Sequence, residues 1–142
     1  FSRGSLRLAS ANPHDHPVID ENMLGHPSDL ARLRDCFRRM IDLTEHEAFR
    51  SSVARVMLDG SGTPASDLVD DAAIDRWLLA TSSDAQHICA TAAMGRVVDD
   101  DCRVLGTDGL RVIDASVIPE VPRANTHLMV LALAEHMASR LV

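Results

Sequence analysis

The sequence predicts a mixed α+β protein, because patterns typical of strands and of helices both occur along it. Apolar and polar side chains alternate over residues 4–10, which is the period of a half-buried strand. In the middle of the chain, apolar residues recur every three or four positions, which is the period of an amphipathic helix. Short apolar runs between turns then precede a long apolar segment at residues 127–141.

The first half predicts one strand followed by three helices. Residues 12–17 form a turn after the strand, and a long helix is expected from an N-cap at Ser28 or Asp29. The apolar stripe of this helix consists of Leu30, Leu33, Phe37, Met40 and Ile41. Thr44-Glu45-His46-Glu47 has the pattern of a capping box and predicts a second, short helix. A loop at residues 59–64 leads to a third helix, marked by Val69, Ala73, Ile74, Trp77 and Leu78.

The second half predicts short strands, turns and a further helix. In order, the expected elements are a strand at 96–98, the acidic turn Asp99-Asp100-Asp101, a glycine-rich turn at 106–109 and a strand at 110–113. Residues 127–141 are apolar on most sides, so this helix is expected to be buried. Asn125 or Thr126 is expected to cap its start.

Length and charge limit the classes of function. The 142 residues, 46% apolar and 25% charged, fit one folded domain. A formal net charge of −7 argues against a nucleic-acid partner, because phosphates would be repelled. No stretch approaches the roughly 20 apolar residues of a membrane span. The first residues, Phe1-Ser2-Arg3-Gly4, include neither an initiator Met nor a signal peptide, so we expect a piece of a longer protein.

The composition excludes or disfavours the chemistry of lysine, tyrosine and paired cysteines within this chain. The fourteen cationic residues are all arginine, so a lysine Schiff base is excluded within this chain, and tyrosine is absent. The cysteines, Cys36, Cys89 and Cys102, are odd in number and without C-x-x-C spacing, which predicts neither a disulfide framework nor a zinc site. A reducing, cytoplasmic location is therefore expected.

Short motifs alone do not identify a site. His14-Asp15-His16 has spacing that two metal ligands can use, but prolines flank it and no third ligand is indicated, so we expect a solvated turn. The acidic run at 99–101 lacks the pattern of a calcium loop and is also expected to be a solvated turn, so no metal site is predicted. G-x-S-x-G, H-E-x-x-H, Walker and G-x-G-x-x-G motifs are absent. By themselves, His87 and Asn125 are an ordinary histidine and a helix cap.

A longer pattern extends over residues 87–138. It comprises His87-Ile88-Cys89-Ala90-Thr91-Ala92-Ala93-Met94-Gly95, then Val97-Val98-Asp99, residues 102–119, and Pro122-Arg123-Ala124-Asn125-Thr126 with Ala134-Glu135. These segments resemble, in order, H-P-x-G-T-x-x-M-G, V-V-D-x-x-x-R-V-x-G-V-x-G-L-R-V-x-D-A-S-V-M-P and P-x-x-N-T…A-E of the glucose–methanol–choline (GMC) flavin oxidoreductases. The start of the chain is similar to the beginning of the substrate domain of these enzymes. The resemblance therefore covers essentially the whole chain.

The resemblance implies a fold and a division of the chain. We expect a GMC-type substrate domain, in which helices cover an antiparallel sheet, and the last strand and helix of a Rossmann-like FAD-binding domain. Residues 1–95 would belong to the substrate-binding domain, and residues 96–142 would return to the FAD-binding domain. Two departures stand out: Ile88-Cys89-Ala90 replaces Pro-x-Gly, and His127 stands where a second Asn is common.

The resemblance also implies site residues. It assigns His87 and Asn125 to the catalytic pair over the flavin. An imidazole, with an ordinary pKa near 6.5, suits removal of a hydroxyl proton, and an amide can donate a hydrogen bond to the developing alkoxide. Residues near FAD would be Asp114, Ala115, Asn125, Thr126, His127 and Leu128. Backbone N–H groups at the start of the last helix would face the part of the flavin that becomes negative on reduction.

The sequence thus predicts the C-terminal portion of an FAD-dependent alcohol oxidoreductase, in which His87 takes the hydroxyl proton and hydride passes to flavin N5. Its expected partners are an N-terminal FAD-binding fragment or chain and a small-molecule alcohol. A choline dehydrogenase-like scaffold is indicated, although residues 78–142 contain no aromatic residue for a cationic-substrate cage. Two other interpretations stay open: a hydroxynitrile lyase on the same fold, and a non-catalytic binding subunit.

Overall fold

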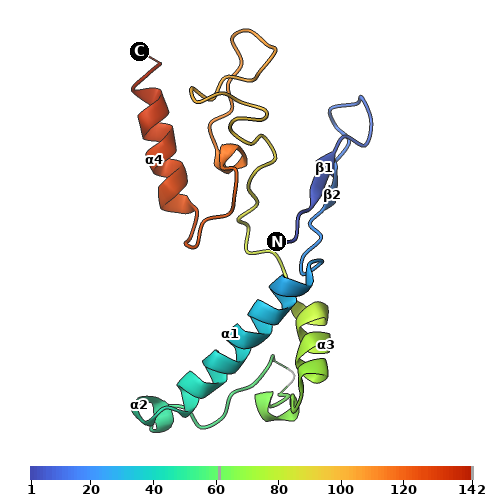
Figure 1. The fold of residues 1–142 in the computed structure, drawn as a ribbon, viewed down its shortest axis with the longest axis vertical. Coiled ribbons are helices and arrows are strands. Elements are labelled where there is room, and N and C mark those ends of the chain that lie inside the picture. Colours follow the sequence, from blue (N-terminus) through green and yellow to red (C-terminus); the bar gives the residue numbers. More distant parts are fainter. Residues whose placement is uncertain (61, 142) are drawn as a thin grey trace. The chain divides into compact units, whose positions relative to one another are not determined.

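The structure is a computed structural model that describes residues 1–60 and 62–141. The chain forms two compact units, Phe1–Ser83 (unit 1) and Asp84–Val142 (unit 2), which are described separately. Both helices and a small sheet are present, so the α+β class is confirmed (Figure 1). The expected boundary at 95/96 concerns which domain of a larger enzyme each part joins, and it stays a prediction. No helix of the described residues is both long and apolar enough to cross a membrane.

Unit 1 begins with the predicted strand. Strand β1 (Ser5–Arg7) pairs antiparallel with β2 (Val18–Asp20), and Leu6 lies opposite Ile19. The turn between them is closed by Asp15, whose carboxylate accepts hydrogen bonds from Ser10 Oγ at 2.5 Å and Asn12 Nδ2 at 3.0 Å. Both strands are exposed, so the hairpin is a ribbon and not a sheet covered by the helices of this unit.

The three predicted helices of unit 1 are α1 (Pro27–Glu45), α2 (Glu47–Arg50) and α3 (Asp71–Thr81). The predicted caps of the first two are wrong, because histidine rings take that role. The Nδ1 atoms of His26 and His46 each accept a backbone N–H at 3.2 Å. Asp29 instead accepts from Ser2, and the Thr44 hydroxyl donates to the Ile41 carbonyl at 2.7 Å.

Helices α1 and α3 pack against each other (Figure 1). The Phe37 and Trp77 rings lie 5.5 Å apart between their centroids, and Arg34 Nη1 lies 2.9 Å from a carboxylate oxygen of Asp75. No residue of α1 is fully buried, and Met40, expected in its apolar stripe, is 60% exposed. The helix prediction is confirmed, whereas the apolar stripe that we expected to be buried is only partly covered by neighbouring residues.

Unit 2 is built around Val98, Cys102, Val117 and Met137, all of which are buried. The strands expected at 96–98 and 110–113 do not form in the described residues; the segments make isolated bridges, Val98 with Val104 and Arg103 with Arg111. Positive φ angles at Gly95 (78°) and Cys102 (58°) turn the backbone out of the extended conformation after only a few residues. Burial raises the pKa of the Cys102 thiol, which stays protonated and packs as a small apolar group.

Helix α4 (His127–Ala138) confirms the last predicted helix but not its expected burial. Met137 is 2% exposed and Leu133 packs against the core, so one side of the helix is covered. Leu128 is 76% exposed and Leu131 49% exposed. The helix therefore leaves much of its apolar surface in solvent within this chain.

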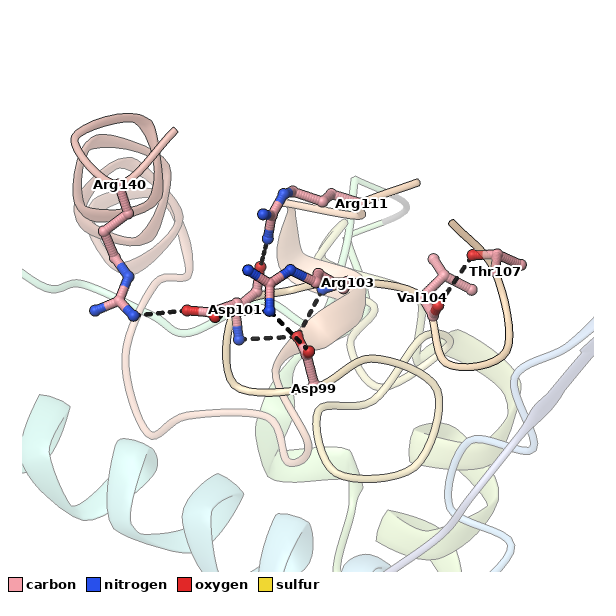
Figure 2. A network of polar contacts seen from close by, with 7 residues as sticks. All are labelled: Asp99, Asp101, Arg103, Val104, Thr107, Arg111 and Arg140. Atoms are coloured by element: carbon pink, nitrogen blue, oxygen red, sulfur yellow. Dashed lines mark hydrogen bonds and ion pairs between the residues drawn. The ribbon is translucent and has the colours of Figure 1, made fainter. Parts of the chain in front are cut away.

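A polar network joins the end of α4 to the acidic turn (Figure 2). Arg140 Nη2 donates to an Asp101 carboxylate oxygen at 2.6 Å, and Arg103 Nη1 lies 3.1 Å from the other oxygen. Asp99 Oδ1 accepts the backbone N–H groups of Asp101 and Arg103 at 2.9 and 2.8 Å, and Arg111 bonds to the Asp101 carbonyl. The expectation of a merely solvated turn is wrong, because two of its three carboxylates hold structure.

The hydrogen bond from Arg140 holds the pKa of Asp101 below its ordinary value. A lowered folded-state pKa means that Asp101 stabilises the fold above its unfolded pKa of about 4 and loses that contribution as the pH falls through the lower folded value. Arg140→Gln should therefore lower the free energy of unfolding at pH 7, and the difference from the wild type should shrink below pH 4. Urea unfolding at a series of pH values measures this.

Arg123→Gln is the matched control, because Arg123 is exposed and has no polar partner among the described residues. An equal loss for Arg140→Gln at pH 7 and at pH 3 would contradict a role through the ionised carboxylate.

Candidate active site

Three segments of unit 2 that carry the predicted site residues are bonded together. The backbone N–H groups of Ala92 and Met94 donate to the carbonyls of Ser116 and Val117 at 3.0 and 2.9 Å, which ties residues 87–95 to residues 114–117. The side chain of Thr126, at the start of α4, lies 3.2 Å from the His87 ring. Residues separated by as many as 39 positions in the sequence are thus brought into contact.

His87 lies on an irregular loop whose backbone turns sharply on both sides. Gln86 and Ala90 have φ angles of 61° and 67°, in the left-handed region. The Cys89 thiol lies 3.4 Å from the His87 carbonyl, and burial raises the pKa of this thiol, so it stays protonated. The half-buried imidazole has its Nδ1 against Thr126, and its Nε2 has no protein partner among the described residues.

Asn125 uses one end of its amide to start α4. Its Oδ1 accepts the backbone N–H of His127 at 2.9 Å, so Asn125 provides the expected side-chain cap and Thr126 does not. Because the carbonyl oxygen faces the backbone, the Nδ2 group of this exposed side chain is left as a double donor. A free Nδ2 group is the donor that the catalytic assignment of Asn125 requires, and the assignment itself stays a prediction.

The start of α4 presents further donors. The His127 N–H is occupied by Asn125, whereas the N–H groups of Leu128 and Met129 have no partner among the described residues. Unpaired N–H groups at the positive end of a helix suit a negatively charged group or a carbonyl oxygen. These atoms fit the electron-rich edge of a flavin. Of the predicted backbone donors, the N–H groups of Thr126 and Leu128 make no hydrogen bond among the described residues.

Asp114 and Ala115 lie at the short 3₁₀ helix η2 (Ala115–Val117). The Asp114 carboxylate accepts the backbone N–H of Ser116 at 2.8 Å and its hydroxyl, so this side chain is committed to the turn. Any contact of this segment with FAD would involve the backbone, as the resemblance implies.

The cavity found in unit 1 contains none of the predicted site residues. It has a volume of about 570 Å³ and lies among α1, residues 53–56 and residues 65–69. Within residues 1–60 and 62–141, no group of three or more His, Cys, Asp or Glu side chains is arranged to hold a metal ion.

The contact of the Thr126 hydroxyl with His87 was not predicted from the sequence, which gave Thr126 as a possible helix cap and as a residue near FAD. The sequence carries no signal for this contact, because a threonine directly before a helix is typical of a helix cap.

Ala90 stands where the family pattern has Gly, and its φ of 67° costs an alanine roughly 1–2 kcal/mol. Ala90→Gly should remove that strain and raise the free energy of unfolding by about 0.5–1 kcal/mol, after the extra chain entropy of glycine is subtracted. Chemical denaturation measures the change. Ala85→Gly, at an exposed position outside the left-handed region, should lower stability by roughly the same amount. A destabilised Ala90→Gly variant would show that the strain is absent.

Comparison with known proteins gives one consistent result. The family profile described as GMC oxidoreductase matches residues 1–134. The chain is 41% identical over 142 residues to pyranose dehydrogenase of Agaricus campestris and 39% identical over 134 residues to ecdysone oxidase of Bombyx mori. The matches cover 96% and 94% of this chain, but only 23% and 20% of those relatives.

A solved structure agrees. Formate oxidase of Aspergillus oryzae RIB40, in a study of FAD modification, superposes with a TM-score of 0.84 at 30% identity, over 96% of this chain and 24% of that one. The chain thus spans about a quarter of the length of the proteins that it matches. The match over residues 1–134 includes the loop of His87 and the start of α4. The chain belongs to the GMC oxidoreductase family.

Proposed function

We propose that this chain provides the substrate side of the active site of an FAD-dependent oxidoreductase that oxidises a CH–OH group. The observation that supports the proposal most is the His87 ring, which is held at Nδ1 by Thr126 and has a free Nε2 beside the segment that carries Asn125. Bound FAD would supply the acceptor for the hydride removed from the alcohol carbon.

His87 supplies the proton acceptor. Its Nε2 would receive the hydroxyl proton of the alcohol while the C–H bond breaks, so that a carbonyl product forms. A positioned general base contributes typically 10²–10⁴-fold to such a step. Only an imidazole with a proton-free nitrogen can do this, and Nε2 is the ring nitrogen that makes no hydrogen bond among the described residues.

Asn125 stabilises the oxygen from which the proton leaves. Its Nδ2 group can donate to the developing alkoxide, and it competes for no proton because an amide does not titrate in this range. The bond from Oδ1 to the His127 N–H fixes the amide, so the donor is oriented before substrate arrives.

The N-terminal FAD-binding part is the partner that this proposal requires. The chain has no G-x-G-x-x-G motif, and the exposed residues Leu128, Met129 and Leu131 of α4 give a nonpolar surface for another part of the protein. A phosphate-binding loop from that part would hold the nucleotide end of FAD, and this chain would contribute the residues beside the substrate.

His87→Ala in the complete FAD-loaded enzyme should slow flavin reduction by alcohol about 10²–10⁴-fold, because the proton acceptor is lost. Anaerobic stopped-flow absorbance with primary alcohols and aldopyranoses measures the rate, and the flavin spectrum reports cofactor occupancy. His136→Ala, an exposed histidine in the last turn of α4, is the control and should be unaffected. Unchanged reduction kinetics in His87→Ala would reject the assignment.

Asn125→Asp separates the two functions of this side chain. A carboxylate oxygen can still accept the His127 N–H, so the helix cap and the fold should be retained. The donor is lost and a negative charge faces the developing alkoxide, so the limiting rate of flavin reduction should fall on the order of 10²–10³-fold. A variant with wild-type thermal stability and a wild-type rate would show that Asn125 serves only as a cap.

A further inference from the structure

Thr126 is the one buried polar residue in the described part of the chain, with 7% of its surface exposed. A buried hydroxyl loses free energy unless it finds a hydrogen-bond partner. The position of Thr126 before α4 suggests a helix cap, but its side chain makes no capping bond. The burial of this hydroxyl therefore requires another explanation.

The partner of the hydroxyl is the His87 ring, 39 positions away in the sequence. Thr126 Oγ1 lies 3.2 Å from His87 Nδ1, and it is the hydrogen-bond contact that the ring makes among the described residues. The neighbouring Asn125 takes over the cap through the His127 N–H, which leaves the Thr126 hydroxyl free for His87.

The bond has a direct consequence for the chemistry of the imidazole. A neutral imidazole carries one proton, and the hydrogen bond at one nitrogen decides which nitrogen holds it. When Nδ1–H donates to Oγ1, Nε2 has a free lone pair and can accept a proton. After Nε2 is protonated, Nδ1–H belongs to a cation and its bond to Oγ1 becomes stronger. The same contact therefore favours both the resting base and its protonated product.

We propose that Thr126 is a positioning residue for His87: its hydroxyl accepts the Nδ1–H bond, keeps the neutral ring in the tautomer with a proton-free Nε2, and fixes the ring orientation. The inference rests on the proposed function of His87 as the proton acceptor. Orientation needs this support because the ring is only half buried and its loop is irregular.

The test compares Thr126→Val with Thr126→Ser in the complete FAD-loaded enzyme. Valine keeps the shape of threonine and removes the hydroxyl, so the limiting rate of flavin reduction should fall about 10- to 100-fold. Substrate affinity, measured from the concentration dependence of that rate, should change little. Serine restores the hydroxyl and should recover the rate to within about threefold. Thr107→Val is the matched control, because among the described residues the Thr107 hydroxyl bonds only to the Val104 carbonyl, in a loop bearing no predicted site residue.

The tautomer itself gives a second readout that needs no active variant. Imidazole ¹³C and ¹⁵N shifts of histidine-labelled enzyme, with the His87 signals assigned by their loss in His87→Ala, show which nitrogen carries the proton. We expect the Nδ1–H form in the wild type and in Thr126→Ser, and a shift toward Nε2–H in Thr126→Val. A wild-type ring protonated at Nε2 would overturn the proposal even if Thr126→Val does not fold.

The outcomes also separate this inference from the proposed function. If His87→Ala slows flavin reduction while Thr126→Val keeps both the wild-type rate and the wild-type tautomer, the positioning function is wrong and the base assignment stands. If Thr126→Ser is as slow as Thr126→Val, the hydroxyl is not the cause and the proposal is also rejected. If His87→Ala reduces its flavin normally, the proposed function fails, and with it the catalytic meaning of Thr126.

Discussion

The position of helix α4 is the constraint on which the candidate site depends. Its C-terminal end is held by Met137 in the core and by Arg140 on Asp101, and its N-terminal end is held by Thr126 on His87. A helix fixed at two points roughly twelve residues apart cannot slide or rotate without breaking a buried contact. The donors at its start are therefore placed by interactions at both ends.

The same helix explains why this chain exposes so much apolar surface. Twelve residues rich in leucine, methionine and alanine can be covered on all sides only by more than one neighbour, and unit 2 supplies one. In a protein whose relatives are about four times longer, the remaining side has room for a second neighbour. Exposed leucines at the start of the helix would then lie next to the donors that we assign to the flavin, so docking and cofactor binding would involve adjacent residues.

Sequence patterns predicted elements well where local physics decides them. The period of apolar residues located α1 and α3, a long apolar segment located α4, and the alternation located β1, because each depends on neighbours within a few positions. The caps at His26 and His46 were missed because a histidine ring seldom replaces Ser, Asp or Asn there. Two segments of unit 2 that form only isolated bridges were predicted to be strands. The pattern of apolar and polar side chains does not reveal the positive φ angle at Cys102 that ends the extended backbone.

The candidate site was predictable only through the ordered resemblance over residues 87–138, because no single motif in it is specific. Two contacts, Thr126 with His87 and Arg140 with Asp101, each join residues that are 39 positions apart. Only the folded backbone brings such residues together.

The segment Asn125-Thr126-His127 both starts helix α4 and contacts the His87 ring. The Asn125 carbonyl oxygen starts the helix and thereby frees both its own amide donors and the Thr126 hydroxyl. If Thr126 capped the helix instead, its oxygen would be turned toward the backbone and the His87 ring would lose its partner. The tautomer that we propose for His87 thus depends on which of two adjacent residues caps the helix, and the amide of Asn125 sets that choice.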